Sequence, residues 1–159
     1  MKKLLVSLAT GIVLMLSLSA MAMAAPAEKD AEKAAFKTEI QAVRDELKGL
    51  KEEAQGIRSN IKSERAEIKE KVDALKESGD KEKIEAVKQY KGQLQAVNQE
   101  LKSNWDARKQ LREEMKSARE AKDIETARAK ASQLLELKKQ AIAKLNEKLK
   151  LLEQICASL

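Results

Sequence analysis

The sequence predicts an all-α fold, namely an elongated antiparallel three-helix bundle or coiled coil that follows an N-terminal signal peptide. The first observation is an apolar stripe whose members follow one another in steps of four and three residues: Phe36, Ile40, Val43, Leu47, Leu50, Ala54, Ile57 and Ile61. On an α-helix this spacing places the side chains on one narrow seam that must find a partner. The second observation is that Pro26 is the only proline, so nothing after it interrupts a long helix. The third is the predominance of Ala, Leu, Glu, Lys, Gln and Arg, which are strong helix formers.

Residues 1–24 have the features of an export signal. A pair of lysines precedes the mostly apolar segment Leu4–Leu18, and the small residues Ala-Met-Ala at 22–24 suit a signal peptidase. We expect cleavage after about Ala24. This leaves residues 25–159 as a single helical domain in the periplasm or outside the cell, with no stable membrane insertion after signal cleavage. The alternative is an uncleaved anchor, because the apolar segment is long enough to cross a bilayer.

The predicted helices run from about 28 to 77, from 81 to 121 and from 124 to 157. Gly79 marks the first break, because glycine readily takes the left-handed conformation that closes a helix, and Asp80 is suited to cap the next helix. So short a connection makes the first two helices antiparallel. The stretch Phe36–Arg65 resembles Tyr90–Arg119, which favours an internal repeat in which both helices carry the same seam.

The second break is predicted from a change of phase. The seam of the second helix predicts contact positions at Lys122 and Glu125, but the apolar residues resume at Ile124 and Ala127. Asp123 is suited to cap a third helix. We expect a turn here, and the alternative is one long helix that is locally overwound.

The third predicted helix has the broadest apolar face. Its first stripe consists of Ile124, Ala127, Ala131, Leu134, Ala141, Leu145, Leu152 and Ile155. A second stripe, spaced by seven residues, consists of Leu135, Ile142, Leu149 and Cys156. Such a face suits a helix that lies in the groove between two others and touches both. The alternative is that the second stripe stays partly exposed and joins another subunit.

The charges are balanced and interspersed. The net charge of +6 falls to +4 when Lys2 and Lys3 are removed with the signal. A nucleic-acid-binding protein normally shows a stripe of one sign, so we expect a solvated surface of ion pairs and no nucleic-acid partner. The chain has no histidine, and it has no Gly-rich phosphate loop. We therefore expect no catalytic, cofactor-binding or metal-binding residue, no small-molecule substrate, and no enzymatic activity.

Two features remain as candidate interaction sites. Cys156 is the only cysteine; in an exported chain it pairs between chains or stays free, as a small side chain in the seam or an exposed thiol. The segment around Asn104, Trp105 and Arg108 puts the only Trp beside polar residues in the seam of the second helix. A recognition patch and simple packing of the Trp are the two interpretations.

The predicted function is that of an exported, non-enzymatic coiled-coil structural or interaction protein of the cell envelope or extracellular space. Protein partners or self-association are expected. In size, export, basic charge and helicity, the chain resembles the small periplasmic helical chaperones as a group. It lacks the β-rich assembly body of one such family and the Leu-Thr-x-x-Gln repeats of another. The resemblance implies the alternative function of a holdase that binds unfolded or hydrophobic clients.

Overall fold

The computed structural model describes residues 26–79 and 81–159, which form three α-helices. Helix α1 spans Pro26–Ser78, α2 spans Lys81–Glu120 and α3 spans Ile124–Ser158. These bounds confirm the three helices expected from the sequence, including the separation of the second and third. The predicted signal peptide and the predicted cap Asp80 lie outside the described residues. Within the described residues, no helix is long and apolar enough to cross a membrane.

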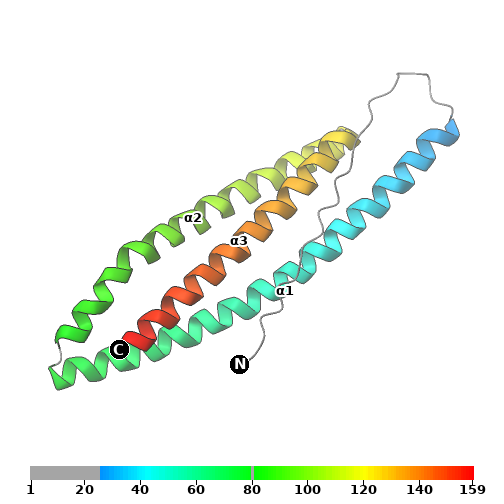
Figure 1. Cartoon of the computed structure of the whole chain (residues 1–159). Helices are drawn as coiled ribbons and strands as arrows, with labels where there is room; N and C mark the ends of the chain where they lie inside the picture. Colours follow the sequence, from blue (N-terminus) through cyan, green and yellow to red (C-terminus); the bar gives the residue numbers. More distant parts are fainter. Residues whose placement is uncertain (1–25, 80) are drawn as a thin grey trace, which may run out of the picture.

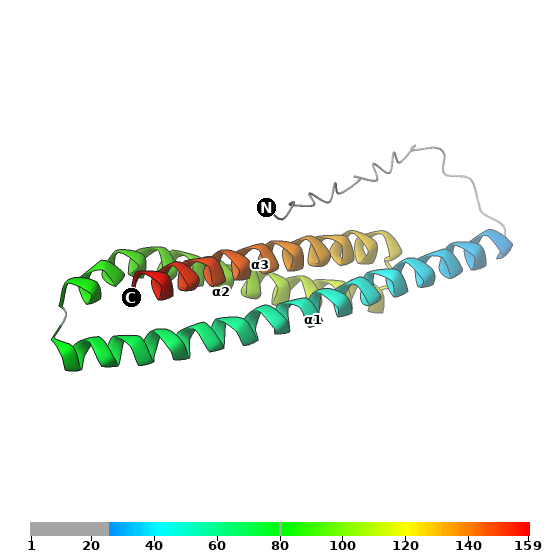
Figure 2. The same ribbon diagram turned by 60° about the horizontal axis from the view of Figure 1, so that its bottom comes forward.

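The three helices lie side by side with alternating direction (Figures 1 and 2). Ion pairs give the register. Glu39 and Glu46 of α1 pair with Arg128 and Lys139 of α3, so these two helices run in the same direction. Helix α2 runs the opposite way, as Figure 1 shows. Helix α3 packs against both neighbours, whereas α1 and α2 make few contacts with each other. Helix α3 is therefore the element that holds the other two together.

The turns explain where the helices end. Gly79 has a φ of 75°, which is the left-handed conformation expected for a glycine that closes a helix. The second turn uses Lys122 in this role, with a φ of 58°. The amide of Lys122 donates to the carbonyl of Arg119 at 3.1 Å and that of Asp123 to the carbonyl of Ala118 at 2.9 Å. This is the Schellman pattern of hydrogen bonds. Asp123 then caps α3 by accepting from the amide of Thr126 at 3.0 Å.

The core lies mainly on α3. Its first stripe is buried except for the half-buried Ile124. Helix α1 contributes Ala54 and Ile61 as buried residues, and α2 contributes Val97 and Ala118. The rest of the α1 stripe is only half-buried. The broad face of α3 thus does what the sequence predicts, because it packs against two helices.

Candidate binding groove

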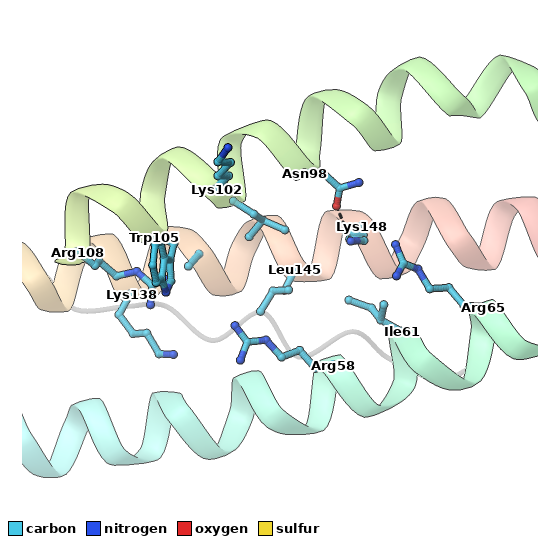
Figure 3. A pocket seen from close by; sticks show the side chains of 12 residues that line it. Arg58, Ile61, Arg65, Asn98, Lys102, Trp105, Arg108, Lys138, Leu145 and Lys148 are labelled. Carbon is cyan, nitrogen blue, oxygen red and sulfur yellow. Dashed lines mark hydrogen bonds between the residues drawn. The ribbon is translucent and has the colours of Figure 1, made fainter.

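A groove with a volume of about 390 Å³ lies between α1 and α2, with α3 at its floor (Figure 3). Each helix contributes side chains to it. The lining consists of Arg58, Ile61 and Arg65 from α1; Asn98, Leu101, Lys102, Trp105 and Arg108 from α2; and Lys138, Ala141, Leu145 and Lys148 from α3. We call the six basic residues of this set, Arg58, Arg65, Lys102, Arg108, Lys138 and Lys148, the cationic groove.

Helical spacing explains why these residues meet. Arg58 and Arg65 are seven residues apart on α1, so two turns of the helix bring them to the same face. Lys102, Trp105 and Arg108 follow each other in steps of three on α2, which also keeps them on one side. On α3 the basic residues bracket Ala141 and Leu145, which are buried members of its first stripe. The apolar contacts that pack the helices therefore also fix the positions of the basic side chains.

The groove carries one sign of charge. None of its lining residues is acidic. None of its six basic residues forms an ion pair with a carboxylate of residues 26–79 or 81–159 as far as these are described. Elsewhere α3 uses its basic residues differently: Lys130 pairs with Glu114 at 2.6 Å, and Lys144 pairs with Glu100 at 2.7 Å. The carboxylates of the bundle thus balance the other faces and leave this groove positive.

Arg108 is the most buried of these cations, with only 7% of its surface exposed. Its Nε donates to the carbonyl of Asn104, one turn earlier in the same helix, at 3.3 Å. Burial, together with the charges of Arg112 and Arg58, lowers the pKa of Arg108 from its ordinary value. The guanidinium remains charged near neutral pH, because arginine is effectively always protonated in proteins. The fold therefore holds a charged group in a place that disfavours charge.

Lys148 is 9% exposed, and its Nζ donates to Oδ1 of Asn98 across the α2–α3 contact. Burial and the charge of Arg65 lower the pKa of Lys148. Burial also lowers the pKa of the half-buried Lys138, and the like charges of Arg108 and Arg58 lower it further. All three shifts have the same direction, because burial and the like charges of neighbouring basic residues both disfavour the charged form.

Trp105 extends from α2 at the side of the groove near Arg108 and Lys138 (Figure 3). It is 53% exposed and is the exposed large hydrophobic side chain of the described residues. The Nζ of Lys109 lies 5.9 Å from the centroid of the ring, within the range of a cation–π contact. Both interpretations from the sequence, a recognition patch and a Trp that packs beside the seam, stay predictions. Trp105 is available to a ligand in the groove.

A second polar cluster lies where the end of α3 meets α1. The Nζ of Lys71 donates to the carbonyl oxygen of Cys156 at 2.9 Å and to its Sγ at 3.3 Å. The thiol donates to Glu67 at 3.0 Å, and this hydrogen bond, with burial, raises the pKa of Cys156. Ligand atoms of Glu64, Glu67 and Cys156 lie within 4.8 Å of one another, which is close enough for a metal ion. The ammonium of Lys71 already supplies the positive charge there, at 3.1 Å from Glu67.

The second stripe of α3 is placed away from the cationic groove. Ile142 and Cys156 are buried, and Leu135 and Leu149 are half-buried. Leu149 packs against the core cluster that includes Ile142. Joining of this stripe to another subunit, and a disulfide between two copies of Cys156, stay predictions.

Comparisons with protein-family models, with curated proteins and with solved structures find no match. The function is therefore inferred from the geometry of the chain itself.

Of the groove residues, the sequence marks Trp105 and Arg108 as candidates, and it does not single out the other basic side chains. Counting charges along the chain hides the groove, because acidic residues stand close to each cation in sequence but point to other faces. A usable signal was present in the seven-residue step from Arg58 to Arg65 and the ten-residue step from Lys138 to Lys148. These steps keep a basic residue next to the apolar stripe of its helix.

Proposed function

We propose that this chain is an exported, non-enzymatic interaction protein of the cell envelope or extracellular space, with coiled-coil packing between its helices, and that it binds an anionic partner in the cationic groove. The single observation that supports this most strongly is the set of six basic residues, brought together from three helices, that have no ion-pair partner among the described residues. Like charges that share a partly buried site repel each other and lose solvation. An anion in the groove offsets both costs.

The groove also suits capture of a ligand from solution. A concave surface that is lined by one sign of charge and backed by the low-dielectric interior of the protein focuses its field and attracts counter-ions. Arg58, Arg65 and Lys102 are exposed at its rim, where they can meet an anion first. Arg108 and Lys148 lie deeper and act on an anion that has entered.

The test uses Trp105, the only tryptophan of the chain, as a fluorescent reporter. Residues 25–159, which contain all three helices, are titrated with a phosphate, a sulfated and a carboxylate polyanion. We expect at least one of these to change the emission, with binding that weakens as salt is added. Charge reversal by Lys102→Glu should weaken binding, and Lys150→Glu, at an exposed position outside the groove, should not. If no polyanion changes the emission or the thermal unfolding temperature, the proposal is wrong.

A holdase remains the second candidate, and the composition of the groove floor favours it. The half-buried Leu101 lies among the basic side chains, next to the buried Ile61 and Leu145, so the groove offers an apolar contact as well as charge to an unfolded segment. A holdase should suppress aggregation of an unfolding model protein at near-stoichiometric ratios. The Lys102→Glu variant should do so less well. Unchanged aggregation in the presence of the wild-type chain excludes this function.

A further inference from the structure

The polar groups of the cationic groove are almost all hydrogen-bond donors. Arginine, lysine and tryptophan side chains donate and do not accept, and they make up seven of the twelve lining residues. The remaining lining side chains are apolar except for that of Asn98. Its Oδ1 already accepts from Lys148, and its amide nitrogen is a further donor. A ligand in this groove finds many donors and scarcely a free acceptor.

This imbalance separates classes of anion. An acidic peptide brings one backbone N–H per residue, and a sulfated or carboxylated sugar brings hydroxyl donors as well as its anionic groups. Donors that enter the groove without acceptors lose their hydrogen bonds to water, which is costly when they are buried. A chain of phosphate groups carries acceptors alone and has charge on every unit. It is the anion whose hydrogen-bonding capacity matches the lining.

The spread of the cations sets the length of the ligand. Lys138 and Lys148 are ten residues apart on α3, which corresponds to roughly 15 Å along the helix axis. Arg108 and Arg58 act on Lys138 at one end, and Arg65 acts on Lys148 at the other. Figure 3 shows the same two ends, with Leu145 between them. One phosphate cannot reach both ends, but an extended chain of phosphates can.

We propose that the cationic groove binds a linear oligophosphate, either free polyphosphate or the phosphate tail of a nucleotide. This inference rests on the proposed function, since it requires that the groove binds an anion at all. Arg108 and Lys148 hold non-bridging phosphate oxygens at the two ends, and the guanidinium fork of Arg108 suits bidentate contact. Trp105 flanks the Arg108 end, where a nucleobase attached to the chain stacks on its ring.

The experiment compares ligands on residues 25–159 by Trp105 fluorescence and by calorimetry. The probes are long-chain polyphosphate, orthophosphate, poly-glutamate of matched charge and an oligothymidylate. We expect polyphosphate to bind at least about tenfold more tightly than the other three. Arg108→Gln or Lys148→Gln removes a charge-assisted hydrogen bond to phosphate, so each should weaken polyphosphate binding by about tenfold or more. Lys150→Gln is the matched control on α3 and should change nothing. Circular dichroism checks the fold, and Arg58→Gln at an exposed position repeats the test without disturbing a buried site.

The outcomes separate the two proposals. If none of the anions binds, the proposed function and this inference both fail. If poly-glutamate or the oligothymidylate binds as tightly as polyphosphate, the groove binds anions but the phosphate-chain inference is overturned. The same holds if Lys150→Gln weakens binding as much as Arg108→Gln. If polyphosphate binds most tightly, a comparison of tripolyphosphate with a nucleoside triphosphate shows whether the ligand is free polyphosphate or the phosphate tail of a nucleotide. If the nucleoside triphosphate binds more tightly than tripolyphosphate and this difference disappears in Trp105→Leu, the ligand is a nucleotide tail. If the two bind with equal affinity, free polyphosphate is supported.

Discussion

Replacing Arg108 by methionine tests whether the groove holds a cation at a cost to stability. The guanidinium is 7% exposed, and burial and two neighbouring arginines lower its pKa. Methionine keeps an unbranched apolar side chain that fills similar space next to the core. The substitution therefore removes the charge while retaining most of the packing. The free energy of unfolding should rise.

The magnitude follows from two opposing contributions. Replacing buried ionic groups by apolar ones is often neutral or stabilising by about 1–4 kcal/mol, and about 2 kcal/mol suits a single cation at the edge of the core. Against this, the Arg108→Met variant lacks the hydrogen bond from Nε to the carbonyl of Asn104, which at 3.3 Å contributes about 1 kcal/mol. The net stabilisation is about 1 kcal/mol. For a domain of this size it raises the Tm by about 3 °C.

The assay is thermal unfolding followed by circular dichroism at low ionic strength. Arg128→Met is the matched control, because Arg128 pairs with Glu39 at an exposed site. Arg128→Met should change the free energy of unfolding by less than about 1 kcal/mol and should not increase it. Added salt should narrow the gap between Arg108→Met and the wild type, because it screens the repulsion among the cations. A Tm that falls by several degrees in Arg108→Met would refute the idea that this cation is uncompensated.

Three further predictions concern the turns and the thiol. Lys122→Gly should raise the unfolding free energy by up to about 1 kcal/mol, because glycine adopts the φ of 58° without the steric cost that lysine bears; a lower Tm would contradict this. The hydrogen bond from the amide of Thr126 lowers the pKa of Asp123. The stabilisation by Asp123 is therefore present above its ordinary pKa and is lost as the pH falls through the lowered pKa. Asp123→Ala should lower the Tm by a few degrees at neutral pH and make no difference in strong acid, and an equal loss at both pH values would count against the cap. Light scattering on residues 25–159 with and without reductant tests the disulfide between two copies of Cys156. A dimer that becomes a monomer on reduction supports this disulfide. A dimer that is unchanged by reductant indicates association through the stripe of Leu135, Ile142 and Leu149.

Most of the fold could be predicted because helical periodicity depends only on the spacing of apolar residues that lie close together in the sequence. The stripe from Phe36 to Ile61, the break at Gly79 and the shift of phase near Asp123 identify the helices and both turns to within two residues. Lys122 was not foreseen as the residue that closes α2. Its left-handed conformation is enforced by the Schellman hydrogen bonds and by α3 folding back, and no local preference of lysine indicates it.

The groove could not be predicted because it depends on how far each helix is rotated toward the others. The sequence shows that Arg58 and Lys138 each lie next to residues of an apolar stripe and that Arg108 lies in the seam of the second helix. It does not show that α1 and α2 fail to close over α3, since this depends on the relative width of three faces. The half-buried α1 stripe and the broad α3 face together leave the gap. The net charge of a chain segment sums the charges on all faces of its helix, so it does not reveal a groove in which only positive side chains gather.

The most direct test of the cationic groove is a two-dimensional NMR titration of residues 25–159 with long-chain polyphosphate. The indole N–H of Trp105 gives a single signal, because the chain has one tryptophan. Binding in the groove predicts that this signal shifts together with the amides around Arg58, Arg108 and Lys148. The amides around Lys76, an exposed residue of α1 outside the groove, should stay in place. Shifts spread evenly over the basic residues of all three helices, or centred away from Trp105, would contradict it.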